Sequence, residues 1–424
     1  MLDYQLTSFS NGLKVITAPM KNTKAVTVLF LIGVGSRYED KNLNGISHFL
    51  EHMVFKGTKK RPTVLDISMA LDSVGASYNA FTTEEYTGFY VRAASEHFDL
   101  ALDIIFDVLY NAKFDPAEID KEKGVIAEEI NMYQDNPQIF IAELAKEVFY
   151  GAEPLGMQVT GKKETISQFK RADFINWRDR HYTPDNMVVV VAGGENGDWL
   201  GKIKQFFDKL TISNQGSYQK IKENQVKPES LVSFKQTDQA HLVIGFRSIP
   251  RKDSRRPILK VLNNLFGENM SSRLFIEVRE KRGLAYYVSS DLADFHDTGA
   301  FAVSCGVDIN RAEDAIKVIL DEFEKLKKSP IPDSELKRAQ ENLKGRMYLS
   351  LEESFAVADF LADQELLYGK IEDPDDLIEQ FKKVTAVDVQ KFAREFLVKE
   401  NLNLAVIGPF KEKQKFQKII ERYQ

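Results

Sequence analysis

The sequence predicts an α+β protein made of two homologous domains, and two observations support this. Short apolar runs alternate with longer amphipathic segments, a pattern that favours helices packed on a sheet. The second half also repeats the first in diverged form, which predicts domains at residues 1–211 and 230–424 with a linker at 212–229. The matching segments lie 208 to 217 residues apart and are Phe49–Met53 with Phe266–Met270, Gly75–Tyr78 with Gly283–Tyr286, Thr87–Gly88 with Thr298–Gly299, and Asp185–Met187 with Glu400–Leu402.

The apolar runs indicate the strands and the longer segments indicate the helices. Strands are expected in the first half at Leu13–Ala18, Val26–Val34, Thr87–Ala93 and Met187–Ala192. In the second half they are expected at Leu231–Phe234, Leu242–Phe246, Phe301–Val307 and Asn403–Ile407. Helices are expected at Ile46–Phe55, Val64–Val74, Phe98–Tyr110, from Pro116 onward, and at Trp199–Leu210, Ser334–Leu349 and Asp376–Phe396.

The composition is that of a water-soluble enzyme. The 424 residues are 43% hydrophobic, enough for two cores, and the net charge of −6 argues against nucleic acid as a partner. No apolar run approaches the roughly 18 residues of a membrane span, and the first residues lack a signal-peptide pattern. The single cysteine, Cys305, cannot form an intrachain disulfide, so we expect a small buried residue and a cytoplasmic location.

The stretch His48-Phe49-Leu50-Glu51-His52 carries the clearest chemistry. Its order, H-x-x-E-H, inverts the common zinc-peptidase signature. On a helix, positions i and i+4 share a face, so His48 and His52 can aim at one metal ion, and Glu51 can hold a metal-bound water. A catalytic zinc has three protein ligands and water, so the motif predicts a third ligand further along the chain.

The third ligand is expected on the helical stretch Glu118–Tyr133, where Glu122 and Glu129 lie two turns apart on one face. Periodicity alone does not exclude the adjacent Glu128. With this spacing the chain resembles the pitrilysin/insulysin family of zinc metallopeptidases, which includes the mitochondrial processing peptidase and its bacterial relatives. The resemblance implies one zinc ion per chain, with Glu129 as the third ligand and Glu122 as a carboxylate that supports the site.

A second family motif lies in the other half of the chain, in Ser272–Phe275 and Arg279–Tyr286. The resemblance implies that Arg279 and Tyr286 bind the substrate backbone and stabilise the developing oxyanion, for which a guanidinium and a phenol are suitable donors. The stretch Asn79-Ala80-Phe81-Thr82 resembles the family's strand edge, which pairs with an extended peptide, and Asn79, Ala80 and Phe81 are its expected substrate-binding residues. The resemblance also implies mainly antiparallel sheets.

The duplication predicts that the second domain holds no metal. His48 and His52 correspond to Leu265 and Asn269, and at the same offset Glu129 corresponds to Arg346, which cannot bind zinc. Glu268, the counterpart of Glu51, is therefore expected to be structural.

We expect a metalloendopeptidase in which Glu51 acts as general base. Family members of this length resemble half of the long clamshell enzymes, which implies a homodimer whose active site is completed by the partner chain. A heterodimer with an inactive paralogue is the alternative. Two other functions stay open: a non-catalytic scaffold subunit, and a dedicated maturase of one precursor.

Overall fold

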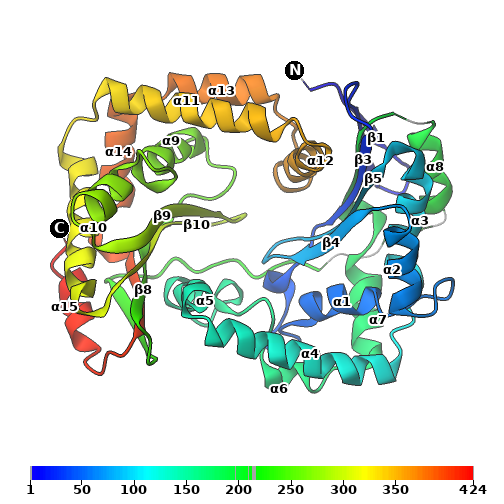
Figure 1. The fold of residues 1–424 in the computed structure, drawn as a ribbon, viewed down its shortest axis with the longest axis horizontal. Helices are drawn as coiled ribbons and strands as arrows, with labels where there is room; N and C mark the ends of the chain where they lie inside the picture. Colours follow the sequence, from blue (N-terminus) through cyan, green and yellow to red (C-terminus); the bar gives the residue numbers. More distant parts are fainter. Residues whose placement is uncertain (1, 196, 209, 213–215, 424) are drawn as a thin grey trace. The chain divides into compact units, whose positions relative to one another are not determined.

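The computed structural model describes residues 2–195, 197–208, 210–212 and 216–423, which form two compact units (Figure 1). Unit 1 contains Met1–Asn131, Met157–Gln219 and Tyr348–Asp373, and unit 2 contains Met132–Gly156, Lys220–Met347 and Pro374–Gln424. Unit 1 includes one segment from the second half of the chain, and unit 2 includes one segment from the first half. The domain boundaries expected from the sequence, 1–211 and 230–424, do not contain this crossing of segments. Residue 209 of the helix expected at Trp199–Leu210 and residues 213–215 of the expected linker lie outside the described residues.

The sheet of unit 1 has six strands in the order β1-β2-β6-β3-β5-β4. Neighbouring strands are antiparallel except β2 and β6, which are parallel. Strand β4 lies at one edge of this sheet and pairs with β5. The strands are β1 (Gln5–Ser8), β2 (Lys14–Pro19), β3 (Ala25–Ile32), β4 (Ser77–Thr82), β5 (Thr87–Ala94) and β6 (Met187–Gly193).

The sheet of unit 2 has five strands in the order β7-β11-β8-β10-β9, and only β7 and β11 are parallel. This order repeats β2-β6-β3-β5-β4 of unit 1, so the predicted duplication and the mainly antiparallel sheets are confirmed. The strands are β7 (Glu229–Phe234), β8 (Gln239–Ser248), β9 (Ala285–Asp294), β10 (Gly299–Asp308) and β11 (Leu402–Gly408).

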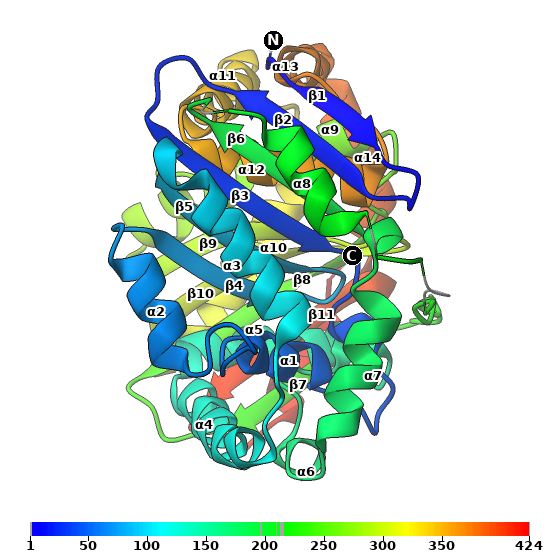
Figure 2. The ribbon, with the colours of Figure 1, turned by 90° about the vertical axis from the view of Figure 1, so that its right-hand side faces the viewer.

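Helices cover both faces of the unit 1 sheet. Figure 2 shows α3 and α8 lying across one face, where Phe30 of β3 packs against Phe207. Helix α12 covers the other face and buries Val357 and Leu361 against apolar side chains of β2, β3 and β6. The central strands β3 and β6 are therefore almost continuously apolar, as expected where neither face of a sheet meets water. The helices are α1 (Ile46–Val54), α2 (Val64–Asp72), α3 (Phe98–Asn111), α4 (Pro116–Asp135, whose end belongs to unit 2), α6 (Lys163–Ile166), α7 (Arg171–His181), α8 (Trp199–Phe207) and α12 (Ser354–Asp363).

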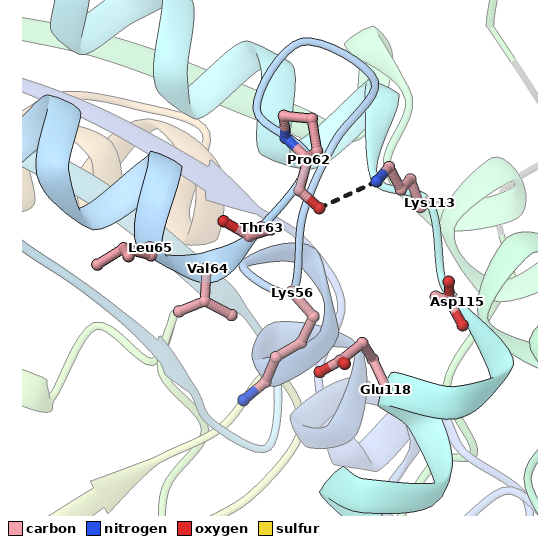
Figure 3. Close-up of a pocket in the computed structure, with 8 residues that line it drawn as sticks. All are labelled: Lys56, Pro62, Thr63, Val64, Leu65, Lys113, Asp115 and Glu118. Atoms are coloured by element: carbon pink, nitrogen blue, oxygen red, sulfur yellow. Dashed lines mark hydrogen bonds between the residues drawn. The ribbon is translucent and has the colours of Figure 1, made fainter.

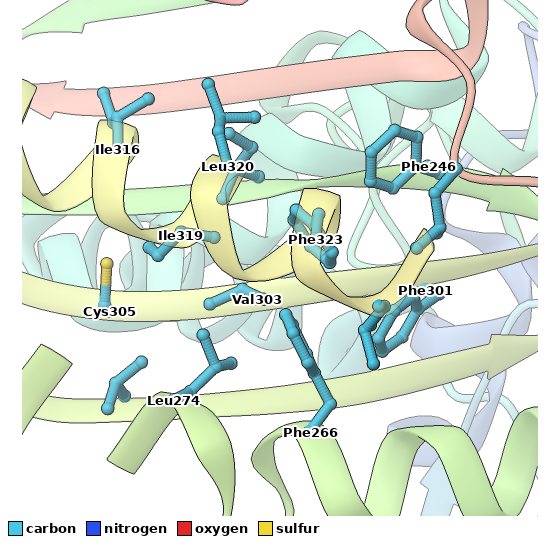
Figure 4. Close-up of a cluster of buried hydrophobic side chains, with 14 of the residues drawn as sticks. Phe246, Phe266, Leu274, Phe301, Val303, Cys305, Ile316, Ile319, Leu320 and Phe323 are labelled. Carbon is cyan, nitrogen blue, oxygen red and sulfur yellow. The ribbon is translucent and has the colours of Figure 1, made fainter. Parts of the chain in front are cut away.

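Unit 2 repeats this layering. Its main core contains a group of phenylalanines, in which Phe266 and Phe323 stack with ring centroids 4.8 Å apart (Figure 4). Cys305 is fully buried in the same core, as its strand-like surroundings predict. Helix α5 covers the opposite face of the sheet. The helices are α5 (Pro137–Tyr150), α9 (Arg256–Gly267), α10 (Ala312–Lys328), α11 (Asp333–Ser350, whose end belongs to unit 1), α13 (Pro374–Lys383), α14 (Ala386–Phe396) and α15 (Gln414–Ile420).

The single helix expected at Asp376–Phe396 is wrong, because the structure divides it into α13 and α14. Thr385 lies between them in an extended conformation, and its hydroxyl accepts a hydrogen bond from the backbone N–H of Asp388. The Asp388 carboxylate accepts in return from the Thr385 N–H, which completes a capping box. The apolar periodicity continues across this break, so the pattern alone does not reveal it.

Candidate metal centre

Helix α1 carries the H-x-x-E-H motif and is amphipathic. Phe49, Leu50 and Met53 are fully buried in the unit 1 core, which fixes the rotation of the helix. The opposite face carries the two imidazoles, whose ring centroids lie 4.6 Å apart, as the i, i+4 spacing predicts. Local sequence therefore aims both histidines in one direction.

Helix α4 brings Glu129 to these two rings. Its Oε1 lies 3.7 Å from Nε2 of His48, and its Oε2 lies 3.7 Å from Nε2 of His52. One ligand atom from each of the three residues lies within 4.8 Å of the others. Glu128, which periodicity does not exclude, is exposed and accepts a hydrogen bond from Asn131 instead.

These three side chains fit a zinc ion. Two imidazoles and one carboxylate form a donor set that catalytic zinc sites use, and a tetrahedron with bonds of about 2.1 Å separates its corners by about 3.4 Å. The two nitrogen–oxygen separations in the protein are both 3.7 Å, which is close to that value. The donor atoms are thus already arranged at nearly the spacing that zinc needs.

A carboxylate sets the tautomer of His52. Nδ1 of His52 lies 2.9 Å from Oε1 of Glu122, and because a carboxylate can only accept, this nitrogen carries the proton. Nε2 is then left with its lone pair toward Glu129. The other oxygen of Glu122 lies 2.6 Å from the ammonium of Lys56, so His52, Glu122 and Lys56 form a continuous chain. Such support of a metal-binding histidine is common in zinc sites.

The two histidines have different electrostatic surroundings. Burial, together with the smaller effect of the neighbouring His52, lowers the pKa of His48 to about 3, so His48 is neutral at physiological pH. Burial also lowers the pKa of His52, but the hydrogen bond that its Nδ1 donates to Glu122, together with the nearby carboxylates, outweighs this effect and raises the pKa overall. Metal binding requires the neutral ring, so a bound metal competes with the proton that the raised pKa of His52 favours.

Glu51 lies between the histidines in sequence and is held by a neighbouring strand. The hydroxyl of Thr82, at the end of β4, donates a hydrogen bond of 2.5 Å to Oε2 of Glu51. Burial raises the pKa of Glu51, while the Thr82 hydrogen bond lowers it. The sequence places Thr82 in the expected edge strand, but no pattern in it indicates that this hydroxyl binds Glu51.

The loop that follows α1 is hydrogen-bonded to the loop that precedes α4, and this contact sets the distance between the two helices that carry the predicted zinc ligands. Thr58 and Ala112 form an isolated antiparallel bridge, and the N–H of Lys113 donates to the carbonyl of Gly57 at 3.1 Å. The Lys113 ammonium donates to the carbonyl of Pro62 at 2.9 Å (Figure 3). Beside these connections lies a pocket of about 270 Å³, with Lys56 on one wall.

The structure places the remaining predicted site residues as follows. Asn79, Ala80 and Phe81 lie on the edge strand β4, which ends beside Glu51. The ring of Phe81 packs over Gly88 on the neighbouring strand, where a Cβ would lie only 2.2 Å from it. The Phe81 ring therefore packs against the protein, whereas Asn79 on the same strand is exposed.

Arg279 and Tyr286 lie together in unit 2. The Arg279 guanidinium lies 4.8 Å from the ring centroid of Phe275 and 5.9 Å from that of Tyr286, which is 75% exposed. Arg279 belongs to a π-helical segment, Phe275–Glu280, and Tyr286 to β9. The two residues are thus neighbours, with the phenol open to solvent.

In unit 2, amides occupy the region that corresponds to the metal group. Asn263 and Asn264 donate to the two oxygens of Glu268 at 2.6 and 2.8 Å. Arg346 stands where Glu129 stands in unit 1, and it donates to Glu268 at 3.4 Å. Glu268 is thus held by hydrogen bonds within the protein, consistent with the structural role expected for it.

Comparison with known proteins adds independent information to this geometry. The model of the insulinase family, peptidase family M16, matches residues 14–163, and the model of the M16 inactive domain matches residues 168–343. A Bacillus subtilis protein named as an uncharacterized zinc protease, YmxG, is 35% identical over 94% of this chain and 97% of its own length. A Streptomyces coelicolor protein, also named as an uncharacterized zinc protease, is 35% identical over 96% of this chain and 90% of its own.

This chain belongs to the insulinase family of peptidases, M16. Among solved structures, a protease from Helicobacter pylori is similar with a TM-score of 0.90 and 25% identity, over 96% of this chain and 100% of that one. A Pseudomonas fluorescens structure described as a peptidase M16 inactive domain has a TM-score of 0.88 at 20% identity, over 97% and 99% of the two chains, which shows a common fold. The metal group of this M16 chain lies within the part matched by the insulinase model. No helix of the described residues has the length and apolar character needed to cross a membrane.

Proposed function

We propose that this M16 chain is a zinc-dependent metalloendopeptidase that hydrolyses extended peptides. The observation that carries the proposal is the convergence of His48, His52 and Glu129 from two helices, with Glu51 beside them. A buried histidine that is neutral at physiological pH and a carboxylate spaced for tetrahedral coordination are what such a site needs. The names of the Bacillus subtilis and Streptomyces coelicolor relatives, both zinc proteases, agree with this assignment.

In this proposal His48, His52 and Glu129 hold the zinc ion, which when bound lowers the pKa of a water molecule and polarises the scissile carbonyl. Glu51 takes the proton from the attacking water and passes it to the leaving amine. Thr82 fixes one oxygen of Glu51, so that the other can face the water. Glu122 holds His52 in the tautomer that presents Nε2.

We assign substrate binding to two elements. The backbone of Asn79 and Ala80 on the edge strand β4 pairs with an extended peptide. The Ala80 N–H donates to Oδ1 of Asn79 at 2.9 Å, so the Asn79 side chain turns away when the peptide takes its place. Arg279 and Tyr286 donate hydrogen bonds to the developing oxyanion, and the exposure of Tyr286 supports a role in contacting a ligand.

The test compares wild type with Glu51→Gln in zinc content and in cleavage of a quenched fluorescent peptide of about 10 residues, with and without a chelator. We expect one zinc per chain in both proteins, chelator-sensitive cleavage by wild type and none by the variant. Wild type without zinc would refute the proposal in favour of a scaffold subunit. Cleavage by Glu51→Gln at the wild-type rate would refute the role of Glu51.

We further propose a homodimer in which zinc of one chain works with Arg279 and Tyr286 of the other. Both motif sets are present in this one chain, which supports self-association over a heterodimer with an inactive paralogue. Mixing two inactive variants, Glu51→Gln and Arg279→Ala, should restore about a quarter of the wild-type activity, because half of the dimers are mixed and each has one intact site. A mixture that exchanges subunits and stays inactive would refute this arrangement.

A further inference from the structure

Helix α1 begins without a side-chain cap of its own. Its N-cap residue, Gly45, has no side chain and adopts a left-handed conformation with φ of 98°. A Cβ at this position would lie 2.8 Å from the carbonyl oxygen of Thr160, so the glycine is required by the close approach of that segment. The first N–H groups of a helix have no partner within the helix, and at a buried start they need another acceptor.

Glu39 supplies that acceptor from six residues upstream of Gly45. Its Oε1 accepts from the N–H of Ser47 at 2.8 Å, and its Oε2 accepts from the N–H of Gly45 at 2.7 Å. The side-chain amide of Asn44 also donates to Oε2, at 3.1 Å. Glu39 is only 3% exposed, so it is a buried carboxylate placed at the positive end of the helix dipole.

The position of these contacts within the helix gives them a functional meaning. Ser47 directly precedes His48, and α1 has only nine residues, so its first turn already carries a predicted zinc ligand. Two strong hydrogen bonds to a charged acceptor hold the backbone of this turn in place. The same loop is fixed to the rest of unit 1 by Asn44, which donates to the carbonyl of Gln158 at 3.0 Å.

We propose that Glu39 is a positioning residue, which sets the backbone of the first turn of α1 and thereby the direction of the His48 imidazole toward the metal. This inference rests on the proposed zinc peptidase function. Glu39 touches neither metal nor substrate and acts through Ser47 and Gly45. Residues that orient metal ligands commonly contribute about 10- to 100-fold to metal affinity or activity.

The test exchanges Glu39 for Gln. Glutamine has one acceptor oxygen, so it can keep only one of the two backbone hydrogen bonds and turns its NH₂ group toward the other N–H. The matched control is Glu365→Gln, the same exchange at another buried carboxylate of unit 1, which is 5% exposed and pairs with Lys14 at 2.6 Å. Measurements at pH 8 keep Glu39 charged, because burial raises its pKa to about 7.

The readouts are the zinc dissociation constant by chelator competition, kcat and KM on the fluorescent peptide, and the melting temperature. We expect Glu39→Gln to weaken zinc binding about tenfold and to lower kcat about tenfold, with KM within twofold of wild type. Glu365→Gln is expected to lower the melting temperature but to leave zinc affinity unchanged. Glu39→Asp, which keeps the charge on a shorter side chain, should fall between wild type and Glu39→Gln and serves if the glutamine variant does not fold.

Equal loss of stability in both glutamine variants with unchanged zinc affinity would overturn the inference, since Glu39 would then be purely structural. If Glu39→Asp is the variant measured, zinc affinity equal to wild type would overturn it in the same way. Failure of the proposed function would look different, because wild type itself would then bind no zinc or cleave no peptide.

Discussion

Replacing Glu122 by Gln removes the charge that links His52 to Lys56 while keeping the size of the side chain. In the protein, Glu122 is 5% exposed at its side chain and accepts from Nδ1 of His52 at 2.9 Å and from Lys56 at 2.6 Å. The amide keeps one carbonyl oxygen for His52. The amide lacks the negative charge that makes Nε2 of His52 a stronger electron-pair donor to the metal.

The size of the effect follows from these contacts. A hydrogen bond to a charged group contributes about 1.5–3 kcal/mol and a neutral one about half as much, so the exchange costs about 0.8–1.5 kcal/mol, which corresponds to about 4- to 12-fold in zinc dissociation constant. Loss of the ion pair with Lys56 adds to this, but solvent screens that pair because the lysine side chain is 24% exposed. We therefore expect zinc binding to weaken between about 10- and 100-fold.

The assay is titration of the zinc-loaded protein with a competing chelator at pH 8, with kcat measured at saturating zinc. Glu118→Gln is the matched control, because it makes the same exchange one turn earlier on α4, where the carboxylate pairs with Lys121 at the surface. The control should bind zinc as wild type does. Zinc affinity of Glu122→Gln within twofold of Glu118→Gln would refute the idea that Glu122 acts on the metal through His52.

Three further predictions concern stability and catalysis. Leu361→Ala leaves a cavity where α12, which comes from the second half of the chain, packs on the unit 1 sheet. This variant should lower the free energy of unfolding, measured in urea, by about 2–5 kcal/mol, and a loss below about 1 kcal/mol would contradict the packing described. Burial and the neighbouring Asp363 raise the pKa of Asp359 from its ordinary 3.8 to about 6, so the folded state binds this proton more tightly and stability falls as pH rises through that interval. Asp359→Asn should then raise the free energy of unfolding by about 2 kcal/mol at pH 8, after allowance for partial exposure, and should leave it unchanged at pH 3. Equal effects at the two pH values would contradict the raised pKa of Asp359. Thr82→Val should lower kcat severalfold without changing zinc content, measured by peptide cleavage and metal analysis, and an unchanged kcat would remove Thr82 from the mechanism.

Local sequence determined those features that depend on spacing within one element. The i, i+4 relation of His48 and His52 fixes their common direction once the helix forms, because the rise and twist of an α-helix are constant. The duplication was likewise detectable from the sequence, because matching segments recur in the two halves, and the two sheets repeat one strand order. The buried state of Cys305 followed from its apolar neighbours.

Only the tertiary structure decided which groups from distant segments meet. Helical periodicity does not distinguish Glu128 from Glu129. The approach of α4 to α1 places Glu129 beside His48 and His52 and leaves Glu128 in solvent. The contacts of Glu39 with Gly45 and of Thr82 with Glu51 likewise depend on how a loop and a strand pack against α1. No repeating pattern in the sequence predicts such contacts of single residues. The sequence also did not predict that α5, from the first half of the chain, covers the unit 2 sheet and that α12, from the second half, covers the unit 1 sheet. An apolar helix face indicates that the helix is buried, but not which sheet it covers.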